Sequence, residues 1–295
     1  MIMKQGLIHH ILAKGAYVAS ALLLHAFLSR YFEIADYGLL SLIITIISFN
    51  YLFVNNGVRQ ALAIALARDE QSRGALIKMA LTVQVLLAVF LTLLNVFASA
   101  TLGSILDDER LPSLLSLAAF IIPFAAVYFG FLGVLNGLKF FKEESQVMII
   151  YAIMRLLPLP FLLLLPLNSS LKTVIWAFLI GSLTTVVYGF LKVKMLIQQE
   201  RDNKDAEPVA FLSKSTRLCL FYMGTTILMS TGVISIKVLL ADDRAVGLFS
   251  AALTLSRPIY FFSVALTAVA IPGVATSLHN GDTGEARLEL LFGFR

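Results

Sequence analysis

Long apolar segments alternate with short polar connections along the whole chain. A bilayer core of about 30 Å is crossed by roughly 20 mainly apolar residues in a helix. Segments of that length lie at about 7–30, 38–64, 75–101, 111–138, 146–167, 172–197, 212–238 and 246–276. The first runs too long for a cleaved signal peptide, and another span comes directly after it. The pattern therefore predicts an all-α, multi-pass transmembrane helix bundle.

Composition agrees with a chain whose solvent is lipid. Of the 295 residues, 59% are hydrophobic and 14% are charged, whereas a soluble domain carries about 25% charged residues. This balance excludes an ordinary soluble globule and a disordered tail. The chain has one cysteine, Cys219, so no disulfide can form within it.

The basic residues are distributed unequally between the two sides of the predicted bundle. The N-terminus and every second connection hold sixteen Lys and Arg, and the alternate connections hold five. The positive-inside rule therefore places the N-terminus in the cytoplasm. Because these residues are scattered over short loops rather than gathered in a stripe, no nucleic-acid partner is expected.

The chain matches itself when it is shifted by 209 positions. Residues 37–53 then lie over residues 246–262, with Gly, Ser, Thr and Tyr identities in register. The paired identities include Gly38 with Gly247, Leu39 with Leu248, Ser41 with Ser250, Thr45 with Thr254, Tyr51 with Tyr260 and Phe53 with Phe262. Chance similarity between two hydrophobic helices is the alternative. A repeat of six helices would give two units of the same orientation.

The repeat predicts how the chain is divided. We expect a first six-helix lobe over 1–197, a cytoplasmic linker over 198–211 and the first two helices of a second lobe over 212–276. Residues 277–295 would form a cytoplasmic turn and the start of a further helix, which points to a truncated chain or a fragment. A complete eight-helix protein is the alternative.

Two arginines fall deep inside predicted spans. Arg155 and Arg257 each lie 13 residues beyond the preceding basic residue at the end of their segment, which is roughly 20 Å along a helix. Intramembrane charges face protein or water and are functional hypotheses by default. The prolines that come after them predict kinks, and an arginine that caps the freed carbonyl groups is the structural alternative.

A third polar group closes the second segment. Asn55, Asn56 and Arg59 share one helix face at spacings of three and four residues, which favours a polar, cationic cavity wall. A side chain that reaches out to the headgroups is the alternative. His25 is expected to hydrogen-bond to a neighbour, and Gly133 with Gly137 forms a GxxxG pair that predicts close helix packing.

The acidic residues all fall in loops or at helix ends. We therefore expect no carboxylate beside the buried arginines, and such a cavity prefers an anion, with phosphate or pyrophosphate as the natural partner of arginine. Missing acids also argue against a metal site and against acid–base catalysis, so the chain is predicted not to be an enzyme. No cofactor is expected, and the chain carries no nucleotide-binding loop.

Several stretches resemble one family. They are ADYGLLSLIIT (35–45), NNGVRQALAIALARD (55–69), YAIMRLLP (151–158), VGLFSAALTLSRPIYFFSVALTAVAIPGVATSL (246–278) and GDTGEAR (281–287). Together they resemble the polysaccharide (oligosaccharide) flippase branch of the multidrug/oligosaccharidyl-lipid/polysaccharide exporter superfamily, and they imply a fold like that of the multidrug and toxin extrusion (MATE) transporters. That family has twelve to fourteen helices, so this chain departs from it in length.

The resemblance implies a function. A lipid-linked oligosaccharide on an undecaprenyl-diphosphate type of carrier would be moved between the leaflets of the cell (inner) membrane by alternating access of two lobes. Arg257 and Arg155 would line the cavity and meet the diphosphate, with Asn55, Asn56 and Arg59 as weaker candidates. The resemblance does not specify the coupling ion. A multidrug/cation antiporter, a peptidoglycan lipid-precursor flippase and a membrane-embedded glycosyltransferase or polymerase are the alternatives.

Overall fold

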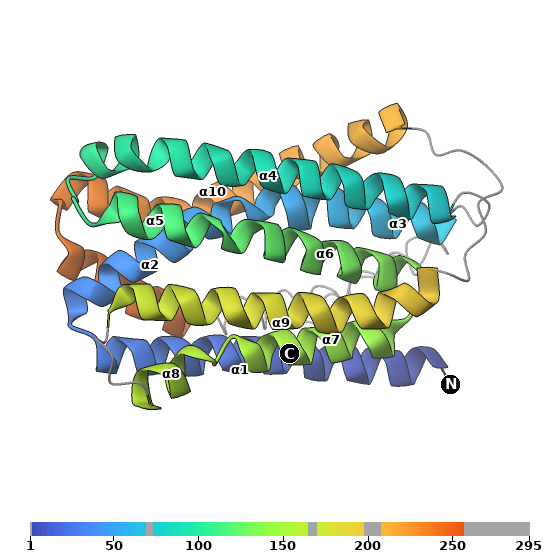
Figure 1. Ribbon diagram of the computed structural model, residues 1–295, viewed down its shortest axis with the longest axis horizontal. Helices are drawn as coiled ribbons and strands as arrows, with labels where there is room; N and C mark the ends of the chain where they lie inside the picture. Colours follow the sequence, from blue (N-terminus) through green and yellow to red (C-terminus); the bar gives the residue numbers. More distant parts are fainter. Residues whose placement is uncertain (1, 69–72, 165–169, 198–207, 257–295) are drawn as a thin grey trace, which may run out of the picture. The chain divides into compact units, whose positions relative to one another are not determined.

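The computed structural model describes residues 2–68, 73–164, 170–197 and 208–256, and this part of the chain is helical throughout apart from short turns. Residues Met1–Ser250 form one compact unit, and a second unit comprises Ala251–Arg295. In the first unit the long helices run side by side, with turns gathered at their two ends (Figure 1). The predicted all-α bundle is confirmed.

In the part of the chain that the structure describes, six helical segments are long and apolar enough to cross a membrane. They correspond to the first six predicted spans: α1 (Ile2–Tyr31); α2 (Ile34–Phe49) with η1 (Leu52–Arg59) and α3 (Gln60–Arg68); α4 (Arg73–Ile105); α5 (Leu111–Ala119) with α6 (Ile121–Gly137); α7 (Phe141–Met154) with α8 (Pro158–Leu164); and α9 (Leu171–Ile197). The seventh predicted span is α10 (Pro208–Leu240), which is bent. Of the eighth, residues 243–256 are described and helical.

Prolines interrupt two of these spans. Pro123 cannot donate to the carbonyl group of Ala119, and the path breaks between α5 and α6 at Phe120. The Thr92 hydroxyl of α4 lies 3.5 Å from the Ala119 oxygen and donates to it. Pro158 begins α8 after a break of three residues beyond Met154, where the sequence predicted a kink.

Large apolar side chains cover the outer surface of the bundle. On α4, Leu86, Phe90, Leu94 and Phe97 are exposed, and Phe97 keeps 77% of its surface. A soluble protein does not expose a continuous apolar stripe of this kind. Because lipid is as apolar as these side chains, the surface suits a helix bundle in a bilayer.

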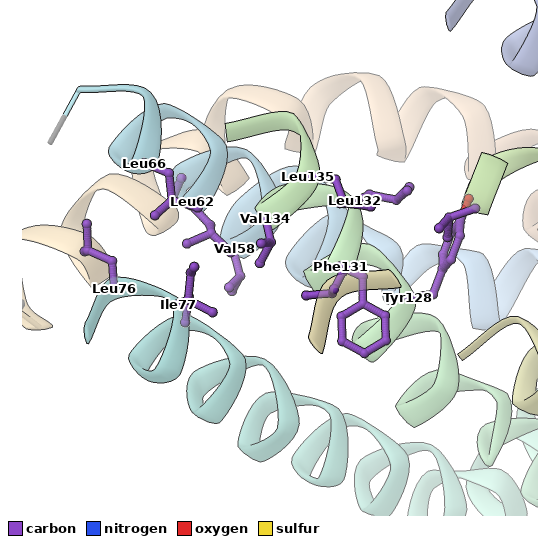
Figure 2. Packing of buried hydrophobic residues seen from close by; sticks show 14 of the residues in the cluster. Val58, Leu62, Leu66, Leu76, Ile77, Tyr128, Phe131, Leu132, Val134 and Leu135 are labelled. Atoms are coloured by element: carbon purple, nitrogen blue, oxygen red, sulfur yellow. The ribbon is translucent and has the colours of Figure 1, made fainter. Parts of the chain in front are cut away.

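The core lies between η1, α3, α4 and α6. Val58, Leu62, Leu66, Ile77 and Val134 are buried there and point toward one another (Figure 2). Glycines bring α6 against α3: a methyl group on Gly137 would lie 2.7 Å from Leu66 Cβ, and one on Gly133 would lie 3.1 Å from the Arg59 carbonyl oxygen. The close packing predicted for the GxxxG pair is confirmed.

The helix boundaries repeat with the offset found in the sequence. Helix α1 ends at Tyr31 and α10 ends at Leu240, which is 209 residues later. The next helices begin at Ile34 and at Asp243, again 209 residues apart. Helix α10 packs against α2, η1 and α3. Helix ends at the same offset agree with the predicted internal repeat.

Candidate functional site

Arg155 lies where α7 gives way to α8. Its backbone N–H still donates to Tyr151, but the chain leaves the helix over the next two residues because Pro158 comes after them. The guanidinium carbon lies 5.2 Å from the centre of the Tyr17 ring, a cation–π contact. The Nη1 atom is buried and has no hydrogen-bond partner among the described residues. Tyr17 therefore holds the arginine through a ring contact and a side-chain hydrogen bond, while Nη1 lacks an acceptor among the described residues.

Three tyrosines from separate helical segments lie around this arginine, and a fourth, Tyr128, stacks on one of them. The Tyr17 and Tyr151 rings are stacked with centroids 5.9 Å apart, and Tyr151 stacks on Tyr128 at 4.6 Å. Tyr51, between α2 and η1, lies within electrostatic range of Tyr17, Tyr151 and Arg155. Sequence reasoning missed these residues. The one available signal was Tyr151, which lies one helical turn before Arg155.

Arg59 belongs to a second polar cluster, at the end of η1. Its Nη1 atom donates to Asn55 Oδ1 at 2.9 Å, and its Nη2 atom lies 3.1 Å from Glu144 Oε1. Asn136 of α6 donates to the other oxygen of Glu144 at 2.9 Å. Asn55 also donates to Asn56 Oδ1 at 3.2 Å. The structure therefore brings the three predicted residues together and adds two that sequence reasoning missed.

Glu144 corrects one expectation from the sequence. It lies in the first turn of α7, as an acid at a helix end should, but its side chain is fully buried and forms an ion pair with Arg59. The Arg59 side chain keeps 20% exposure and points into the bundle rather than toward headgroups. The expectation that the candidate arginines have no acid nearby is thus wrong for Arg59.

A π-helix positions the Arg59 cluster. Residues Leu52–Arg59 form it between two α-helical segments, and π-helical turns inside α-helices are rare and occur frequently at functional sites. Their widened turn leaves carbonyl groups in need of donors. Gln84 of α4 is fully buried and donates from Nε2 to Val54 and to Ala126, at 2.9 Å each. Gln84 therefore stabilises the segment that carries Asn55, Asn56 and Arg59.

Tyr128 connects the two clusters. It stacks on Tyr151 beside Arg155, and its phenol lies within electrostatic range of Arg59 and Glu144. Along α7 the two ends are separated by 11 residues, from Glu144 to Arg155, which is roughly 16 Å. The clusters form one polar seam inside the first six spans.

The other predictions have mixed outcomes. Arg257 lies outside the described residues. His25 is buried, and its Nδ1 atom lies 3.1 Å from the Tyr37 hydroxyl, so the expected hydrogen bond is present. Among the described residues no group of three or more His, Cys, Asp or Glu side chains could hold a metal ion.

Residues 27–289 match the family model described as polysaccharide biosynthesis protein. The chain belongs to the polysaccharide biosynthesis protein family. This membership agrees with the resemblance found in the sequence to the polysaccharide (oligosaccharide) branch of the exporter superfamily. A search of the curated proteins found no match.

The fold of this family member is similar to that of a solved transporter. That structure is described as an inward-facing conformation of a multidrug resistance MATE family transporter of the MOP superfamily. The TM-score is 0.71 at 15% identity, and the match covers 94% of this chain and 66% of the other. The chain thus spans about two thirds of that transporter's length. The MATE-like fold predicted for this multi-pass membrane protein is confirmed.

Proposed function

We propose that this family member moves lipid-linked oligosaccharide from the inner to the outer leaflet of the cytoplasmic membrane. The family supports a role in polysaccharide biosynthesis, and the fold is similar to that of a transporter. The mechanism would be alternating access of two six-helix lobes, of which residues 1–197 form the first. The N-terminus would lie in the cytoplasm, in agreement with the distribution of Lys and Arg.

Arg155 is the observation that carries this proposal. A charged group inside a membrane protein is expensive unless it is paired, yet Nη1 of Arg155 is buried without an acceptor among the described residues. Guanidinium groups bind phosphate through two parallel hydrogen bonds. The diphosphate of an undecaprenyl type of carrier would supply the missing acceptors, with Arg257 as a second donor.

Arg59, Asn55 and Asn56 have a different place in the mechanism. Because Glu144 already neutralises Arg59, a phosphate would bind there only by displacing that carboxylate. The two asparagines offer amide groups to a sugar, but in this state Asn55 accepts a hydrogen bond from Arg59 and donates one to Asn56. We therefore assign them to a later position along the seam rather than to the first contact.

Substitution of Arg155 in the full-length protein tests the proposal. Arg155→Ala should abolish surface polysaccharide, and Arg155→Lys should restore little, because an ammonium group keeps the charge but loses the planar pair of donors. Arg217→Ala is the matched control: it removes an exposed arginine of α10 whose side chain bonds to Ser213 one turn away. Membrane abundance is measured alongside. Normal export in Arg155→Ala at normal abundance would contradict the proposal.

A multidrug/cation antiporter is the second candidate, and Glu144 favours it. A buried carboxylate is the kind of group that binds a coupling cation, and Glu144 is fully buried. Its pairing with Arg59 and Asn136 argues against a free cation site in this state. Dye efflux driven by sodium or protons, lost in Glu144→Gln and intact in Arg155→Ala, would favour this candidate over the flippase.

A further inference from the structure

Five charged side chains form one network at a single end of the helices. Arg110 donates to Asp36 at 2.7 Å and to Asp243 at 3.3 Å. Lys237 lies 2.7 Å from Asp243 and 3.5 Å from Asp108. The turns that carry these residues, after α1, α4 and α10, lie together at the left of Figure 1. This end is the outer one if the N-terminus is cytoplasmic.

The network joins the first six spans to α10 and the helix after it. Asp36 lies in the first turn of α2, and Asp108 and Arg110 lie in the turn between α4 and α5. Lys237 lies in the last turn of α10, and Asp243 begins the next helix. Two contacts cross from one part to the other: Arg110 with Asp243, and Lys237 with Asp108. Two other pairs lie within one part each: Asp36 positions Arg110, and Asp243 positions Lys237.

The two crossings differ in exposure. Lys237 keeps 2% of its side-chain surface and Asp108 keeps 5%, whereas Arg110 keeps 52%. An exposed ion pair contributes little to stability, whereas a buried charge that loses its partner destabilises the structure strongly. The pKa of the Arg110 guanidinium is raised, chiefly by its hydrogen bond to Asp36, so this arginine stays charged at every physiological pH. The buried Lys237–Asp108 contact therefore stabilises the closed end more than the exposed Arg110–Asp243 contact does.

Directly below the network the backbones touch. A methyl group on Gly38 would collide with the Asp243 carbonyl oxygen and would lie 2.8 Å from the Gly247 nitrogen. Ser41, one turn further along α2, is buried. The charged network therefore lies next to a direct backbone contact between α2 and the helix that begins at Asp243.

We propose that this network is a latch that holds the outer side of the transporter closed. The proposal rests on the proposed alternating access of two lobes, because release to the outside would require the first lobe to separate from the start of the second here. Both crossings must break for that separation, while the pairs within each part can persist. The state described here is closed at this end, and opening is limited by the buried Lys237 contacts.

Accessibility of a buried cysteine tests the latch without any substrate. Ser41→Cys is introduced into the full-length protein with Cys219→Ser and any other cysteine replaced, and a membrane-impermeant maleimide is added outside intact cells. Labelling of Ser41→Cys alone should be slow. Lys237→Met should speed it by about fivefold or more, and Arg110→Gln by less, because each raises the population of the open state.

Two variants show whether the effect belongs to the latch. Lys237→Arg keeps the charge and should keep labelling slow. Arg244→Gln removes an exposed arginine next to Asp243 and should change nothing. Three results would each contradict the latch. They are unchanged labelling in both Lys237→Met and Arg110→Gln, fast labelling of Ser41→Cys when Lys237 and Arg110 are intact, and an equal rise in Arg244→Gln. Faster labelling in a protein that exports no polysaccharide would sustain the latch and overturn the proposed function instead.

Discussion

Gly38 and Gly247 pack against each other, and their contact is reciprocal. A methyl group on Gly38 would meet the Asp243 carbonyl oxygen and the Gly247 nitrogen, and one on Gly247 would meet the Ile34 carbonyl oxygen and the Gly38 nitrogen. Ile34 and Asp243 are themselves 209 residues apart, as the two glycines are. Each half of the contact is thus the image of the other.

A reciprocal contact of this kind places a local two-fold axis between the two glycines. Self-complementary contacts arise when like surfaces face each other across such an axis, and parallel repeats in transporters are related by an axis along the membrane normal. This explains why the repeat preserves small residues at positions 38 and 247: any larger side chain would enter the partner backbone. The glycine identity at positions 38 and 247 is therefore required by the close packing of the two backbones.

Gly38→Ala and Gly247→Ala are each expected to destabilise the protein. The added methyl group has no space, and overpacking of this kind costs about 1–3 kcal/mol. Because the displaced atoms are backbone rather than flexible side chains, we expect the upper part of that range. Thermal unfolding of the full-length protein in detergent, monitored by size-exclusion chromatography, should show a lower midpoint for both variants.

Gly15→Ala and Gly224→Ala are the matched controls for the contact between Gly38 and Gly247. These glycines are also 209 residues apart, and a methyl group on either has nothing within 4 Å. Replacement of glycine by alanine inside a helix is worth about 1 kcal/mol, so both midpoints should stay the same or rise. An equal fall in the unfolding midpoint at all four positions would mean that Gly38 and Gly247 are not packed more tightly than the control glycines.

Removal of Glu144 should destabilise the protein more than removal of the pair. Glu144→Ala leaves Arg59 without its counter-charge, and breaking a buried ion pair costs about 3 kcal/mol or more. The 20% exposure of Arg59 places the loss at the lower end. Arg59→Met combined with Glu144→Leu removes both charges and should recover most of the unfolding midpoint.

A double-mutant cycle on these two residues measures the coupling. The variants are compared by thermal unfolding, and the polysaccharide exported by each is measured in parallel. Restored stability with lost export would assign Arg59 a role beyond packing. A double variant no more stable than Glu144→Ala would contradict the ion pair as the source of the loss.

Hydropathy was sufficient to predict the first six spans because lipid imposes a long apolar run on every crossing. The same pattern could not show that Glu144 would face Arg59, since the two lie 85 residues apart and the acid stands in a helix's first turn, where acids are ordinary. Nor could it show the tyrosines around Arg155, which come one each from different parts of the chain. Contacts between helices depend on how each helix is rotated, and an apolar pattern that is nearly uniform around the helix leaves that rotation undetermined.

The Gln84 side chain is expected to matter for stability because it holds the π-helix against α4 and α6. Gln84→Leu keeps the volume but removes the donor shared by the Val54 and Ala126 carbonyl oxygens. A buried acceptor left without a partner costs about 1–3 kcal/mol, so the unfolding midpoint should fall. Thr82→Val, an exposed change on the same helix, is the control, and an equal fall there would remove the special role of Gln84.

Tyr17 offers the last test, because its ring and its hydroxyl group can be separated. The Arg155 guanidinium lies over the ring face, and cation–π contacts contribute about 0.5–2 kcal/mol. Tyr17→Phe keeps that contact and should retain most export, whereas Tyr17→Leu removes it and should free Arg155 to leave its position, with export falling severalfold at normal abundance. Tyr188→Leu removes the ring beneath Lys192, which lies 5.6 Å from that ring's centre, and should leave export unchanged because that pair is not part of the seam. If Tyr17→Phe were as defective as Tyr17→Leu, the hydroxyl group rather than the ring would position Arg155, and the stacking argument would be wrong.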